Sequence, residues 1–224
     1  MVLDIASNMQ AVQENIVNLA LKSGRDPEEI TLLVVSKGRS LEEILTSCQL
    51  GVCDFGENRL PEALEKMEKV SKNLRWHFIG NLQSKKVSKA IGKFCLLHSV
   101  DSFKLAELIS LRSVDRGLVT NILLQANVSG ETSKRGLSAE GWKSCFEEIL
   151  SLKGICVKGL MTMAPNTDDR EVIREAFSAL RNLRKSLNAL GGNLLELSMG
   201  MTNDYDIAIE EGATIVRIGS GIFS

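Results

Sequence analysis

Apolar and polar positions along the chain follow two repeating patterns. Short apolar runs end in glycine or polar residues, and longer stretches with apolar residues three or four positions apart follow them. Unbroken apolar runs are typical of strands buried on both faces, whereas the longer spacing predicts helices with one buried face. The pattern predicts strands at 32–37, 52–55, 76–79, 94–98, 121–128, 156–161, 194–197 and 214–218.

Helices are expected between these strands. One helix is predicted to begin near Ser40, three are predicted to end near Lys72, Ile91 and Arg116, and three are predicted to cover 138–150, 168–189 and 203–211. A further helix is predicted over 4–23, before the first strand. Eight strands alternating with seven helices match an α/β fold, the (β/α)8 or TIM-type barrel, typically about 250 residues long. We predict one such barrel domain over 1–224. It lacks an eighth helix, and the extra N-terminal helix covers part of its outer wall. An open doubly wound sheet is the alternative.

Composition and charge narrow the classes of function. The net charge of −1 gives no broad attraction to nucleic acid or to an anionic membrane, and no apolar run approaches the roughly 20 residues of a membrane span. The N-terminus lacks the layout of a signal peptide, and the five cysteines form no CxxC pair. These features indicate a cytoplasmic protein with reduced thiols, no metal site, and neither nucleic acid nor membrane as a partner.

The first predicted strand ends in Lys37, after Leu32-Leu33-Val34-Val35-Ser36. Ligands of parallel α/β folds sit at the carboxyl ends of the strands, so a lysine here is placed to meet one. Apolar surroundings would lower its pKa, and the free amine could then form a Schiff base with a carbonyl group. The alternative is a lysine whose stem lines the strand end while its head reaches water.

The loops after the last two strands carry chemistry suited to a phosphate. They read Ser198-Met199-Gly200-Met201-Thr202 and Arg217-Ile218-Gly219-Ser220-Gly221. Phosphate is often held at these two places in a TIM-type barrel, and glycine lets backbone N–H groups close on an anion. Ser198 and Thr202 could also cap the helix expected near Asn203. The alternative is that the glycines only permit turns.

Several other polar residues lie within or just after predicted strands. Arg217 could place a permanent charge in the barrel mouth, opposite a heteroaromatic nitrogen, or form a salt bridge at the barrel floor. Asn58 could contact a flat ligand or cap the next helix. His77 and His98 are each alone in their strands, so we expect hydrogen-bonded core residues rather than metal ligands or bases.

The chain resembles a known family in several segments that span nearly its whole length. These are Val35-Ser36-Lys37, Phe55-Gly56-Glu57-Asn58, Trp76-His77-Phe78-Ile79-Gly80, Leu82-Gln83-Ser84-Lys85-Lys86, His98-Ser99-Val100-Asp101-Ser102, Asn127-Val128-Ser129-Gly130-Glu131 with Ser133-Lys134, Gly159-Leu160-Met161-Thr162, Leu197-Ser198-Met199-Gly200-Met201 and Gly212 to Gly219. The family is that of the pyridoxal phosphate homeostasis proteins, single-domain relatives of the N-terminal barrel of bacterial alanine racemase. The chain departs from the family pattern at Gly38-Arg39 and at Asn81.

The resemblance implies a cofactor and its ligands. It implies that Lys37 carries pyridoxal 5′-phosphate as a Schiff base, that Ser198, Thr202, Gly219 and Ser220 hold the phosphate, that Arg217 faces the pyridine nitrogen, that Asn58 lies beside the cofactor, and that Lys134 contacts cofactor or anion.

The function implied by the resemblance is control of the intracellular pool of this cofactor, a form of vitamin B6, without catalysis. Racemisation needs a base on each face of the substrate α-carbon, and the only tyrosine here is Tyr205. A racemase of low activity and a Schiff-base aldolase are the alternatives. Enzymes that lack their pyridoxal phosphate are possible partners, and a monomer is expected.

Overall fold

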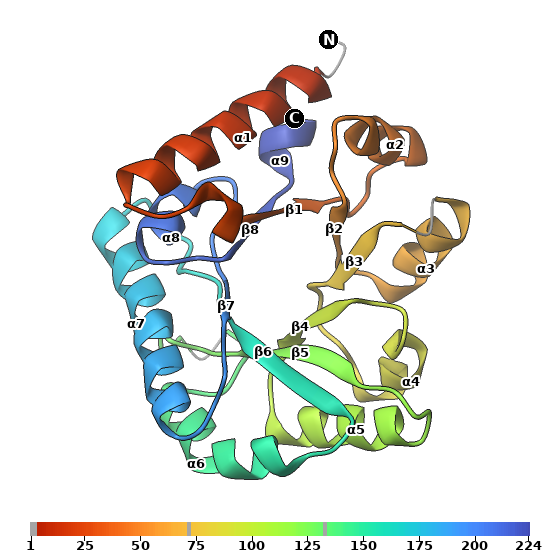
Figure 1. Cartoon of the computed structure of the whole chain (residues 1–224), viewed down its shortest axis with the longest axis vertical. Helices are drawn as coiled ribbons and strands as arrows, with labels where there is room; N and C mark the ends of the chain where they lie inside the picture. Colours follow the sequence, from red (N-terminus) through yellow and green to blue (C-terminus); the bar gives the residue numbers. More distant parts are fainter. Residues whose placement is uncertain (1–3, 71–72, 132–133) are drawn as a thin grey trace.

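The computed structural model describes residues 4–70, 73–131 and 134–224. In this part of the chain, eight parallel strands close into a barrel in sequence order, and helices surround it (Figure 1). The strands are β1 (Thr31–Val35), β2 (Asp54–Glu57), β3 (Arg75–Phe78), β4 (Leu96–Val100), β5 (Thr120–Gln125), β6 (Ile155–Met161), β7 (Glu196–Ser198) and β8 (Ile215–Ile218). The predicted TIM-type barrel is confirmed, and the open sheet is wrong because β1 pairs with β8.

The outer layer consists of helices, of which the N-terminal one precedes the first strand and the others follow the strands. They are α1 (Ile5–Lys22), α2 (Leu41–Gln49), α3 (Leu60–Lys69), α4 (Val87–Ala90), α5 (Phe103–Val114), α6 (Ala139–Ser151), α7 (Arg170–Ala189), α8 (Tyr205–Glu210) and α9 (Ser220–Phe223), with 3-10 turns η1 (Pro27–Glu29) and η2 (Ser84–Lys86). None of the described helices combines the length and the apolar character that a membrane crossing needs.

The N-terminal helix α1 covers the wall where the last helices are short, as predicted. It lies across α8 and α9 in Figure 1. The Asn8 amide donates to the carbonyl oxygens of Ile222 at 3.1 Å and Ser224 at 3.3 Å. The expectation that no helix follows the eighth strand is wrong, because Ser220–Phe223 forms the single turn α9, against which α1 packs.

Helix α7 shows how the sequence pattern produces the outer layer. Its buried residues recur every three or four positions and face the barrel: Ile173, Ala176, Phe177, Leu180, Leu183 and Leu187. Burying a large apolar side chain contributes about 1.5 to 3 kcal/mol, so this stripe holds the helix in place. The Asp169 carboxylate caps the helix by accepting from the N–H groups of Glu171 and Val172.

Strand ends are where sequence and structure differ most. The predicted first strand includes Lys37, but β1 ends at Val35, and Ser36 is the last buried residue. The predicted seventh strand ends before Ser198, but β7 includes Ser198 as its last residue, and this residue is fully buried. Polar residues enter the barrel here because they hydrogen-bond one another, which an apolar pattern cannot reveal. The predicted helix end at Lys72 lies outside the described residues.

Candidate functional site at the carboxyl end of the barrel

Most of the predicted site residues lie where β1, β7 and β8 end. Val34 of β1 pairs with Ile218 of β8, so the segments that follow the two strands leave the barrel side by side. A Cβ on Gly219 would lie 3.3 Å from the Val35 backbone oxygen. Lys37 and the Gly219 loop therefore share one edge of the barrel mouth.

Lys37 is exposed in the turn after β1. The expectation that apolar surroundings shield its amine is wrong for this structure, because Ser36 is the last buried residue and the turn at Lys37-Gly38, where Gly38 has a φ of 69°, is exposed. Its side chain is thus accessible to a ligand that enters the mouth from solvent.

A buried ion pair lies next to the turn that carries Lys37. The ammonium group of Lys66, a residue 6% exposed, donates to Glu57 Oε1 at 2.7 Å, to Glu62 Oε1 at 2.6 Å and to the Ser36 carbonyl oxygen at 2.7 Å. Three N–H groups are all that a lysine offers, so each has an acceptor. Glu57 Oε1 also accepts from the Ser36 hydroxyl at 2.8 Å.

These bonds fix the backbone on both sides of Lys37. The residue before it is held through its carbonyl oxygen by Lys66, and the N–H of Gly38 donates to Glu62 Oε1 at 2.7 Å. The charged network thereby positions the lysine without touching its amine. Neither acid was singled out in the sequence. The four-residue spacing of Glu62 and Lys66 on one helix could have suggested their pairing, whereas no local signal links Glu57 to Lys66.

The two glycine-bearing loops contact each other at the mouth. The Ser220 hydroxyl donates to Thr202 Oγ1 at 3.1 Å, and the Gly221 N–H donates to the same oxygen at 3.3 Å. Gly200, with φ of 90°, lies so close to α8 that a Cβ there would come within 2.6 Å of the Ala208 Cβ. The turns need these glycines, and they also bring hydroxyl and N–H groups together.

The predicted cap of α8 is wrong. That helix begins at Tyr205 rather than near Asn203, its N-terminal cap position is Asp204, and no side chain caps it by a hydrogen bond. The Asp204 carboxylate instead accepts from the Met201 N–H at 2.5 Å. Burial raises the pKa of Asp204, against the opposing effects of the Met201 N–H and the charge of Arg217.

Arg217 lies inside the barrel and is 4% exposed. Its guanidinium donates to Ser198 Oγ at 2.7 Å and to the Thr162 carbonyl oxygen at 2.9 Å, so it points toward the mouth and not to a floor salt bridge. Burial lowers the pKa of Arg217 to about 10, with the nearby charge of Asp204 acting in the opposite direction. The group therefore remains charged at neutral pH.

His77 and His98 are hydrogen-bonded core residues, as predicted. Sequence reasoning missed that they meet: His77 Nδ1 lies 2.9 Å from His98 Nε2. His98 Nδ1 in turn lies 2.9 Å from Ser198 Oγ, and His77 Nε2 lies 3.1 Å from Asp54 Oδ1. Burial, followed by the charges of His77 and Arg217, holds the pKa of His98 well below its ordinary value.

Asn58 and Lys134 occupy other parts of the site region. The buried Oδ1 atom of Asn58 lacks a hydrogen-bond partner in the described part of the chain, and Arg59, not Asn58, precedes α3 as its cap residue. Lys134 follows β5 and donates to the Met163 carbonyl oxygen at 3.3 Å while pairing with Glu131 at 3.1 Å. Lys134 thus lies by the end of β6, and Ser133 lies outside the described residues.

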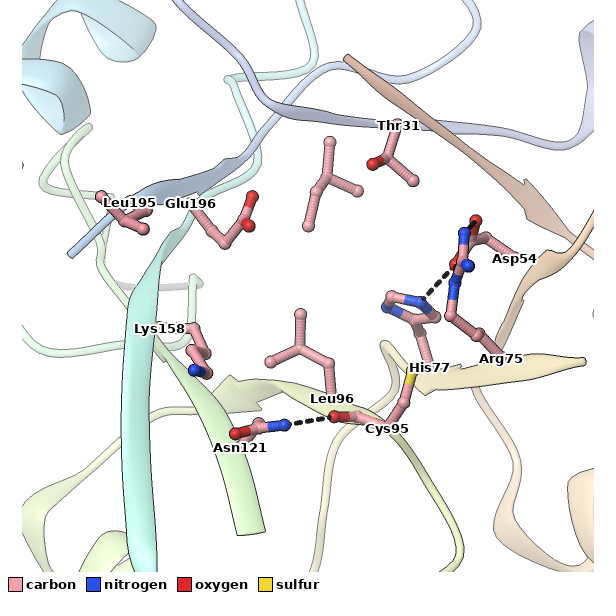
Figure 2. Close-up of a pocket in the computed structure, with 11 residues that line it drawn as sticks. Thr31, Asp54, Arg75, His77, Cys95, Leu96, Asn121, Lys158, Leu195 and Glu196 are labelled. Carbon is pink, nitrogen blue, oxygen red and sulfur yellow. Dashed lines mark hydrogen bonds and ion pairs between the residues drawn. The ribbon is translucent and has the colours of Figure 1, made fainter. Parts of the chain in front are cut away.

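A cavity of about 380 Å³ opens at the other, amino end of the barrel (Figure 2). It is lined by first residues of strands, among them Thr31, Asp54, Arg75 and Glu196, and His77 points into it. Two of its charged groups, Asp54 and Arg75, pair with each other. The carboxyl end, where the lysine turn and the glycine loops converge, is the better candidate for ligand chemistry.

The described residues contain no cluster of three or more histidine, cysteine, aspartate or glutamate side chains suited to a metal ion. The five cysteines are free thiols, in agreement with the sequence. Burial, followed by the charge of Asp54, raises the pKa of Cys95 to about 12, so this thiol beside the cavity stays protonated.

Comparison with known proteins gives consistent results. Residues 7–224 match the family model of the alanine racemase N-terminal domain. The pyridoxal phosphate homeostasis protein of Aquifex aeolicus is 40% identical over 223 residues, which cover 99% of this chain and 98% of that one. Its namesake in Pseudomonas aeruginosa is 40% identical over 220 residues, covering 98% and 94%.

Solved structures agree in fold. PipY of Synechococcus elongatus, in a structure with PLP bound, superimposes with a TM-score of 0.84 at 30% identity, covering 95% of this chain and all of that one. Alanine racemase of Clostridium difficile superimposes with a TM-score of 0.78 at 18% identity; the match covers 98% of this chain and 56% of the racemase. That second likeness concerns the barrel fold alone.

Proposed function

This chain belongs to the family of pyridoxal phosphate homeostasis proteins, and we propose that it binds pyridoxal 5′-phosphate releasably at the carboxyl end of its barrel. The observation that carries the proposal is the juxtaposition of the Lys37 turn with the Thr202–Ser220 contact. A reactive amine after β1 and the hydroxyl groups after β7 and β8, which suit an anion, then lie together at the carboxyl end of the barrel.

The residues at the mouth fit the cofactor chemically. The ε-amine of Lys37 would hold the cofactor through its aldehyde, in a linkage whose formation releases one water and which water would reverse. Thr202 and Ser220 offer hydroxyl groups to the phosphate, and Gly219 offers backbone that a side chain would obstruct. Lys134, held near the end of β6, supplies a further positive charge at the rim.

Arg217 and Asn58 suit the two sides of the pyridine ring. Arg217 has five N–H groups, of which the two described bonds use two, so its charge can face the ring nitrogen and keep it unprotonated. An unprotonated ring is a weak electron sink, which favours storage over turnover. The unpartnered Asn58 Oδ1 is a polar atom that a ligand could satisfy.

The position of Tyr205 also supports a role without catalysis. Its hydroxyl accepts from the Asn15 side chain of α1 at 2.6 Å, so it is engaged at the outer wall rather than in the barrel mouth. In the described residues this leaves Lys37 without a tyrosine to act as the second base of a racemase. The proposed role is to hold and release the cofactor for intracellular vitamin B6 balance, in the cytoplasm, where free thiols persist.

The test is an absorbance spectrum of purified protein with added pyridoxal 5′-phosphate, before and after borohydride reduction. We expect a visible band that Lys37→Ala abolishes, and a reduced adduct that peptide mapping assigns to Lys37. Lys22→Ala, at an exposed position of α1, serves as the control and should keep the band. An adduct at another lysine would overturn the proposed site, and racemisation of an added amino acid would overturn the proposed absence of turnover.

A further inference from the structure

A continuous line of hydrogen bonds runs through the barrel interior. It joins Asp54 at the amino end, through His77, His98 and Ser198, to Arg217 at the mouth. We name these five residues the core relay. All five are less than a tenth exposed, and both histidines of the protein belong to it.

The two ends of the core relay determine which group donates and which accepts in its terminal hydrogen bonds. A guanidinium can only donate, so Ser198 Oγ accepts from Arg217. At the other end, hydrogen bonds from His77 and Arg75 outweigh the effect of burial and hold the pKa of Asp54 below its ordinary value. An ionised carboxylate can only accept, so His77 Nε2 must carry a proton.

With both histidine rings neutral, the groups between the two ends have one consistent arrangement of protons. Four hydrogen bonds need four protons, and Arg217, Ser198, His98 and His77 supply one each when both histidines are neutral. The Ser198 hydroxyl therefore donates to His98 Nδ1, and His98 Nε2–H donates to His77 Nδ1. Both rings carry their proton on Nε2, and the Ser198 proton points away from the mouth.

We propose that Asp54, His77, His98 and Ser198 are positioning residues that hold Arg217 toward the cofactor ring, so that the barrel floor is coupled to the cofactor site. The inference rests on the proposed function, since it assigns the relay to the same site. It also gives Ser198 a role through Arg217, because its only proton is committed to His98. His77 and Asp54 line the cavity at the amino end of the barrel, so this end of the relay can be altered without changing a residue of the mouth.

The first arm of the test is long-range 1H–15N NMR of the cofactor-free protein at neutral pH. With two histidines in the chain, the four ring nitrogens can all be assigned. We expect both rings to show a protonated Nε2 and an unprotonated Nδ1. A protonated Nδ1 on either ring would overturn the relay, and this arm needs no variant and no bound cofactor.

The second arm compares two variants at the floor. Asp54→Asn replaces the fixed acceptor by an amide that can also donate, so the relay loses its direction; we expect affinity for pyridoxal 5′-phosphate to fall about 5-fold or more. Glu196→Gln removes the same charge from the same cavity, but Glu196 bonds Thr214 outside the relay, so the affinity should not change. Equal affinities of the two variants would overturn the coupling, whereas failure of the wild-type protein to bind would refute the proposed function.

Discussion

The buried network behind Lys37 yields the sharpest prediction, for Lys66→Met. Methionine keeps most of the volume of the lysine but removes three hydrogen bonds of 2.6 to 2.7 Å. Glu57, which is fully buried, then retains a single donor, the Ser36 hydroxyl on Oε1, while its Oε2 already lacks a partner among the described residues. Removing one member of a buried ion pair costs about 3 to 5 kcal/mol, because the other charge is left uncompensated.

The assay is urea unfolding followed by fluorescence of Trp76 and Trp142, both of which are buried. We expect a lower midpoint with an unchanged slope, as for a loss of stability alone. Lys69→Met, on the exposed face of the same helix α3, is the matched control and should stay within about 0.5 kcal/mol of the wild type.

A double-mutant cycle separates the ion pair from general damage to the helix. Glu57→Gln in the Lys66→Met background removes the uncompensated charge, so the double variant should be more stable than Lys66→Met alone. Losses that simply add, or a Lys66→Met variant within about 1 kcal/mol of the wild type, would refute the reasoning.

Three further outcomes are expected. Gly200→Ala should destabilise the protein by about 2 kcal/mol or more, measured by thermal unfolding, because φ of 90° and the close approach of α8 exclude a side chain. Asp54→Asn should cost about 2 kcal/mol at pH 7. The native pKa of Asp54 is lowered, so its contribution is present above its unfolded-state pKa of about 3.9 and is lost as pH falls through the native pKa; unfolding at pH 7 and pH 3 should show the penalty shrinking. Thr202→Val should weaken pyridoxal 5′-phosphate binding about 10-fold, measured by titration of absorbance, because it removes the hydroxyl that joins the two loops.

The sequence by itself determined the architecture and was enough to propose where the candidate site lies. Apolar runs broken by helical stretches predict the barrel because each buried parallel strand must be covered on both faces. Ser40 illustrates how local such signals are: its hydroxyl and the Glu43 carboxylate form the capping box at the start of α2, within four residues of the chain. Lys37 and the loops bearing Gly200 and Gly219 were found in the same way, since each follows directly from the end of a strand.

Only the tertiary structure decided which polar residues meet. Glu57 and Lys66, or His77 and His98, lie on separate elements, and nothing in their local sequence specifies that they are buried together. An apolar pattern records which positions avoid water, but a buried polar group is stable only when a partner from elsewhere in the fold satisfies it. The apolar pattern therefore could not predict the strand ends or the core relay, because the hydrogen-bond partners of these polar residues come together only when the barrel closes.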